Sequence, residues 1–117
     1  MNFIESLNNT IKHWMKDNKD EWLFVKFRET EIDILDSSSA FSLIDKTIPV
    51  LLNENNRDIW NELFETIFAL VRKSNTTEVP KSISDNWDTL KKLSHQDSSY
   101  AQGKFEELAT YYRIDLQ

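Results

Sequence analysis

The segment DIWNELFETIFALV, residues 58–71, contains the strongest helical pattern in this 117-residue chain. Its apolar residues recur at intervals of three and four: Ile59, Trp60, Leu63, Phe64, Ile67, Phe68 and Val71. This spacing places them on one side of an α-helix, where they can be buried together. Asn55 and Asp58 bracket the expected start of this helix. We predict that it is the central helix of the fold.

The rest of the chain is also typical of helices. It contains only one glycine and two prolines, which are too few turn-forming residues for the many turns of an all-β protein. Shorter apolar stripes predict four further helices, which carry the residues from Phe3 to Met15, Ala40 to Leu52, Ile83 to Leu93 and Ala101 to Tyr112. Pro49 lies inside the second of these and predicts a bend or a restart there.

Residues 22–35 have a different pattern. The segment WLFVKFR (22–28) is aromatic and β-branched, and EIDIL (31–35) alternates in part, which favours a small β-hairpin turning at Glu29 and Thr30. Helix is the alternative that remains open for this region. The predicted fold is therefore mostly α: one domain, residues 1–117, built as a bundle of about five helices with a small β-hairpin near residues 22–35 (α+β).

The charge balance limits the partners. The net charge is −6, from 20 acidic and 14 basic residues, whereas a nucleic-acid-binding surface needs clustered lysines and arginines. No apolar run has the length of a membrane span, the N-terminus does not have the pattern of a signal sequence, and there is no cysteine. We expect a cytoplasmic protein that binds neither nucleic acid nor a membrane and that suits a basic protein partner.

No catalytic motif is present. A chain with one glycine has neither a glycine-rich phosphate loop nor a Gly-x-Ser-x-Gly elbow. His13 and Asp17 lie one helical turn apart and supply two metal ligands at most, while His95 stands alone. We therefore predict no catalytic residue, no cofactor and no metal. An enzyme remains an alternative only if a pocket gathers carboxylates with one of the histidines.

The best candidate for a contact surface lies between positions 20 and 36, where six acidic residues accompany two basic ones. On a strand, Glu31 and Asp33 would share one face and form a negative ridge, although a solvated strand face with a helix cap is the ordinary explanation. Two tryptophans in polar surroundings are added as candidates for partial exposure, with core packing favoured for each. The predicted partner-binding residues are Asp20, Glu21, Trp22, Glu29, Glu31, Asp33, Asp36 and Trp87.

Three segments carry a resemblance to a functional class: EWLFVKF (21–27), RDIWNELF (57–64) and ELATYYRI (107–114). In style, the chain resembles the small acidic immunity proteins that bacteria encode beside polymorphic or contact-dependent toxins. The resemblance implies that the protein binds a cognate toxin domain, often a nuclease, and covers its basic active site. The alternative is a helical adaptor that docks another helical protein through Trp87 or a groove beside the central helix, in which case binding would be insensitive to salt.

Overall fold

The computed structural model describes residues 2–16, 20 and 22–114. Across these residues it contains seven α-helices and no strand. The helices are α1 (Phe3–Lys16), α2 (Trp22–Glu31), α3 (Ser37–Leu52), α4 (Arg57–Ser74), α5 (Lys81–Asp85), α6 (Trp87–Asp97) and α7 (Ser99–Tyr112). The prediction of a mostly helical fold is confirmed, and the predictions of five helices and of a hairpin are wrong.

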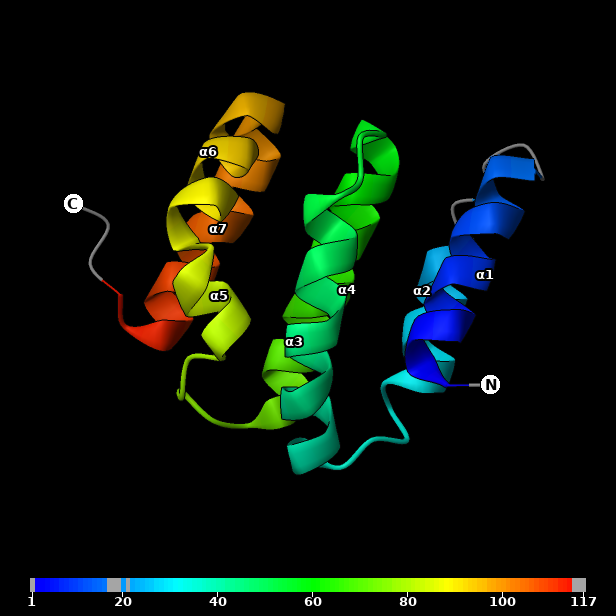
Figure 1. Cartoon of the computed structure of the whole chain (residues 1–117), viewed down its shortest axis with the longest axis horizontal. Helices are drawn as coiled ribbons and strands as arrows, with labels where there is room; N and C mark the ends of the chain where they lie inside the picture. Colours follow the sequence, from blue (N-terminus) through cyan, green and yellow to red (C-terminus); the bar gives the residue numbers. More distant parts are fainter. Residues whose placement is uncertain (1, 17–19, 21, 115–117) are drawn as a thin grey trace.

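The helices form a slab that is two helices thick. Figure 1 shows three pairs side by side, α1 with α2, α3 with α4, and α6 with α7, with the short α5 beside α3. One layer contains α1, α3, α5 and α6, and the layer behind it contains α2, α4 and α7. The dimensions of 41 × 32 × 19 Å follow from this arrangement, because two layers of helices measure about 20 Å across.

Helix α4 lies at the centre of the second layer, as its apolar stripe predicts. Within α4 only three residues are exposed, Arg57, Asp58 and Arg72. The side-chain oxygen of Asn56 accepts hydrogen bonds from the backbone N–H groups of Asp58 and Ile59 at 2.9 and 3.1 Å, so the cap lies between Asn55 and Asp58, the two residues that bracket the predicted start. The helix therefore has a defined start and is buried along most of its length.

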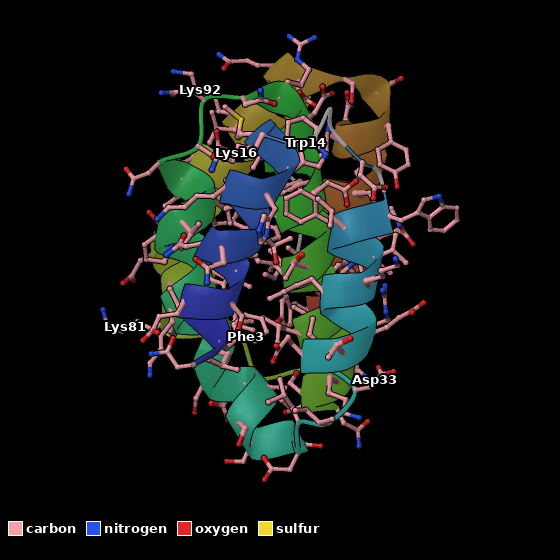
Figure 2. All side chains as sticks on the ribbon, turned by 90° about the vertical axis from the view of Figure 1, so that its right-hand side faces the viewer. Phe3, Trp14, Lys16, Asp33, Lys81 and Lys92 are labelled. Carbon is pink, nitrogen blue, oxygen red and sulfur yellow. The ribbon has the colours of Figure 1, made fainter. Side chains whose placement is uncertain are left out.

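The predicted hairpin is replaced by α2 and the turn that follows it. The buried residues of α2 are Phe24 and Phe27, and the three-residue interval places both on the side that faces α1. There Phe27 contacts Phe3 and Phe24 contacts Trp14, with ring centroids 5.2 and 6.4 Å apart. Figure 2 shows the labelled Phe3 and Trp14 directed between α1 and α2. Aromatic packing on α1 thus overrides the strand propensity of the segment.

Two other boundaries differ from the sequence prediction. Helix α3 continues through Pro49 to Leu52 without a restart, although the proline has no N–H to donate to the carbonyl of Asp45. The helix predicted near Ile83 is divided at Asn86 into α5 and α6. Ser98 caps α7, since its hydroxyl oxygen accepts a hydrogen bond from the N–H of Ala101 at 3.0 Å.

Candidate protein-binding face

The structure brings three of the predicted binding residues together on the outer side of α2. Glu29 lies two turns after Trp22, and Asp33 lies one turn further, so the three form a stripe along the helix and the turn after it. The side chain of Trp22 is 59% exposed, which makes the prediction of core packing wrong for this residue. Asp33 is labelled at the far end of α2 in Figure 2. We call Trp22, Glu29 and Asp33 the α2 stripe.

The remaining predicted residues lie elsewhere. Glu31 is on the opposite side of α2, toward α1, because two residues span about 200° on a helix; the ridge shared by Glu31 and Asp33 is therefore wrong. Trp87 is half-buried in α6, and its ring centroid lies 4.5 Å from that of Phe105. Glu21 lies outside the described residues, and so does Asp17, the residue one helical turn after His13.

Two of the predicted acidic residues cap helices. The carboxylate of Asp20 accepts a hydrogen bond from the backbone N–H of Trp22 at 3.0 Å, at the start of α2. The carboxylate of Asp36 accepts one from the N–H of Ser39 at 2.7 Å, and this hydrogen bond lowers the pKa of Asp36. Both carboxylates also lie at the positive end of a helix dipole, so a structural role accounts for them.

A groove of about 490 Å³ lies between the α2 stripe and α4. Its lining residues are Val25, Arg28, Glu29, Ile32, Asp33, Glu65, Ala69, Arg72 and Lys73. Most of its basic groups are occupied inside the protein. Arg28 Nη1 lies 2.9 Å from Glu62 Oε1, and Lys73 Nζ donates to the backbone oxygen of Asp33 at 3.0 Å. The side chain of Glu29 makes no hydrogen bond or ion pair with any described residue, so its negative charge is available to a partner.

A second groove, of about 590 Å³, lies on the other side of α4, against α7. It is lined by Phe68, Arg72, Gly103, Glu106, Glu107, Thr110 and Tyr111. Arg72 lines both grooves, so they flank one outward face of α4. We call the surface formed by the two grooves and the α2 stripe the α4 face. Its α4 and α7 residues were not predicted from the sequence, because nothing in the pattern states which helices are neighbours.

Polar contacts hold α7 against α4 at the end of this groove. The hydroxyl of Tyr100 donates to Glu65 Oε1 at 2.7 Å, and Lys104 Nζ lies 3.6 Å from the same oxygen. The hydrogen bond to Glu65 raises the pKa of Tyr100 to about 12. Lys104 Nζ also lies 5.4 Å from the ring centroid of Phe68, within the range of a cation–π interaction. These contacts fix the relative position of the two helices that form the groove.

The distribution of charge differs from the predicted acidic strand face. The seven helices contain twelve acidic and twelve basic residues, so they are neutral as a set. The net charge of −6 is therefore carried by the chain ends and the segments between helices. Any electrostatic attraction of a basic partner acts through individual carboxylates on a neutral helical surface, and Glu29 is one of them.

The ionisable residues of the described chain are not gathered as in a metal site. Within residues 2–16, 20 and 22–114, no group of three or more His, Cys, Asp or Glu side chains is arranged to hold a metal ion. Neither His13 nor His95 lines a groove of the α4 face, and both are exposed. Among the same residues, no helix combines the length and the apolar character that a membrane span requires.

Comparisons with protein-family models, with curated proteins and with solved structures found no match for this chain.

Proposed function

We propose that this protein acts by binding another protein, as an immunity protein that blocks a cognate bacterial toxin domain in the cytoplasm. The observation that carries the proposal is the α2 stripe, in which Trp22 is 59% exposed and the carboxylates Glu29 and Asp33 line an open groove. Blocking a toxin needs only occupancy of its active site. The mechanism is therefore steric and electrostatic, and it requires no catalytic residue.

Trp22 supplies the apolar part of this contact. A large aromatic side chain that is 59% exposed leaves apolar surface in water, and burying it against a partner is favourable. Tryptophan is enriched among the few interface residues that dominate binding energy.

Glu29 and Asp33 supply the charge. Both side chains are exposed, and neither carboxylate makes a hydrogen bond or ion pair with the rest of the described chain. The active site of a nuclease toxin is basic because it binds phosphates, so these carboxylates would steer the toxin toward the α2 stripe and align it there. A neutral background of helices restricts this attraction to the stripe and the acidic connections.

The test is a binding measurement between this protein and the C-terminal domain encoded by the adjacent upstream gene. We expect a one-to-one complex that abolishes toxicity in cells. Association should slow as ionic strength rises from about 0.1 M to about 1 M, which shortens the Debye length from about 10 Å to about 3 Å. A purified domain that is toxic and shows no affinity for this protein would remove the proposal.

Matched variants locate the contact on the protein. Trp22→Ala should weaken binding by about 2 kcal/mol, roughly thirtyfold, whereas Met15→Ala, which removes an equally exposed side chain on α1, should change it little. Glu29→Lys should slow association. Asp88→Lys, an exposed position on α6 in the other layer, serves as its control. Equal effects of the test and control variants would place the contact elsewhere.

The second candidate function is a non-enzymatic adaptor that docks a helical protein. Its support is the groove between α4 and α7, whose floor contains the aromatic rings of Phe68 and Tyr111. Apolar burial dominates such a contact, so its affinity should depend weakly on salt. A complex that keeps its affinity at high ionic strength and tolerates Trp22→Ala would favour the adaptor over the immunity protein.

A further inference from the structure

The one glycine of the sequence has no role inside the described structure. Gly103 lies in the second turn of α7, where a glycine is unfavourable relative to alanine. Its φ is not positive, so the backbone does not require glycine there. A Cβ atom built on it would meet nothing within 4 Å, so it does not provide space for a neighbouring helix. The missing side chain leaves an opening in the groove between α4 and α7.

That groove has the dimensions of a short helical ligand site. On α7 its lining runs from Gly103 to Tyr111, which at 1.5 Å per residue is about 12 Å, or roughly two helical turns. Its volume of about 590 Å³ lies in the usual range for binding pockets. Of the two aromatic residues that line the groove, Tyr111 is partly exposed and Phe68 is buried, and at Gly103 the backbone of α7 itself is accessible. A partner helix can approach closely at such a position, as helices do at small residues.

The two walls of the groove carry opposite charges. On α7, Glu106 and Glu107 are exposed; Glu107 lies 3.5 Å from Lys104 Nζ, and the side chain of Glu106 has no partner among the described residues. On α4, the guanidinium carbon of Arg72 lies 5.1 Å from the ring centroid of Phe68. The α7 wall therefore offers the carboxylate of Glu106 to a cation of the partner, whereas Glu107 already has Lys104 beside it.

From these observations we infer that the groove between α4 and α7 binds an amphipathic helix of a partner protein, with about two turns inserted, apolar side chains against Tyr111, close backbone approach at Gly103, and a lysine or arginine facing Glu106. The inference rests on the protein being a binding module. It does not require the α2 stripe or a toxin partner. It assigns a separate ligand, a partner helix, to the groove between α4 and α7.

The experiment uses the full chain and a displayed library of random peptides of about 15 residues, the length at which isolated helices begin to be stable. Peptides are selected on the wild-type protein and then tested on Gly103→Gln, which fills the opening. Glutamine is the better helix former and meets open space at its Cβ, so this variant should be at least as stable as the wild type in thermal unfolding. Its folding is checked in that way before binding is compared.

We expect the selected peptides to have apolar residues at intervals of three and four and a lysine or arginine along one flank. Their affinity should fall about tenfold or more on Gly103→Gln, and Glu106→Lys should reverse the preference for basic residues. Trp22→Ala should leave their binding unchanged. NMR shifts on binding should centre on the amides of Thr110 and Tyr111.

Three results would overturn the inference: no peptide retained better by the wild type than by Gly103→Gln, selected peptides without basic residues, or NMR shifts confined to the α2 stripe. The last of these would leave the proposed function intact, because it would place binding on Trp22 and Glu29. Conversely, a toxin domain that fails to bind would leave the peptide result standing, so the two proposals fail separately.

Discussion

The hydroxyl of Tyr100 on α7 donates a hydrogen bond of 2.7 Å to the carboxylate of Glu65 on α4, across the exposed end of the groove between these helices. The side chain of Tyr100 is 60% exposed, yet this bond and the nearby carboxylates raise its pKa from 10.0 to about 12. The contact therefore links the two helices only while the phenol is protonated.

Stability should consequently depend on alkaline pH. Because the folded-state pKa of Tyr100 lies above the unfolded value, its contribution is complete below about pH 10 and is lost as the pH rises toward 12. Tyr100→Phe should lose less stability across this interval than the wild type, and near neutral pH it should be destabilised by about 1 kcal/mol or less. Urea unfolding at several pH values measures both effects, and an identical pH dependence of the two proteins would contradict the assignment.

For a second tyrosine, loss of the hydroxyl is expected not to lower the free energy of unfolding. Tyr112 is buried, and its hydroxyl has no hydrogen-bond partner among the described residues. Burial raises the pKa of this phenol. Because an unsatisfied buried hydroxyl is unfavourable, Tyr112→Phe should leave the free energy of unfolding unchanged or raise it by about 1 kcal/mol. Tyr112→Ala is the control and should cost about 3–5 kcal/mol, since it removes the buried ring. A loss above about 1 kcal/mol in the phenylalanine variant would reveal a missed partner.

The helical state of α2 can be tested at Lys26, which is exposed in the middle of the segment. In a helix, alanine is more favourable than threonine by about 0.6 kcal/mol, whereas in a strand threonine is the better residue. We therefore expect Lys26→Ala to be more stable than Lys26→Thr in urea unfolding. The reverse order would restore the β-hairpin, so the sign of the difference discriminates between the two structures.

The cap of α4 gives a prediction with an adjacent control. Asn56 accepts two backbone hydrogen bonds, from Asp58 and Ile59, so Asn56→Ala should lower the free energy of unfolding by about 1 kcal/mol. Asn55 is exposed, and its side chain makes no hydrogen bond with the described residues, so Asn55→Ala should have little effect. Comparable losses in both variants would mean that the helix begins one residue earlier.

Local sequence patterns were sufficient for several elements. The stripe from Ile59 to Val71 predicts α4, and Asn2 and Ser98, which accept backbone hydrogen bonds at the starts of α1 and α7, are of residue types that commonly cap helices. These features depend on neighbours three or four residues apart, which any single sequence displays. The boundary at Asn86 was missed, because neither a glycine nor a proline marks it.

The conformation of residues 22–31 depends on contacts that are distant in the sequence. Their aromatic and β-branched composition favours a strand, but Phe24 and Phe27 are buried on Trp14 and Phe3 of α1 only if the segment is helical. The same change of period moves Glu31 to the side of α2 away from Asp33 and brings Glu29 into line with Trp22. Which of the predicted binding residues share one side of the segment therefore became clear only once the segment was known to be helical.

Composition and periodicity alone establish a chain built mainly from helices, with α4 at its centre, because helix formation and burial of one apolar side are local consequences of residue order. The grooves beside α4 arise differently. Arg72 lines both of them only because α2 and α7 pack on opposite sides of α4, and Gly103 opens one of them only because α7 lies there. Which helices become neighbours depends on how all the apolar sides are buried at once, so the α4 face exists only in the tertiary structure.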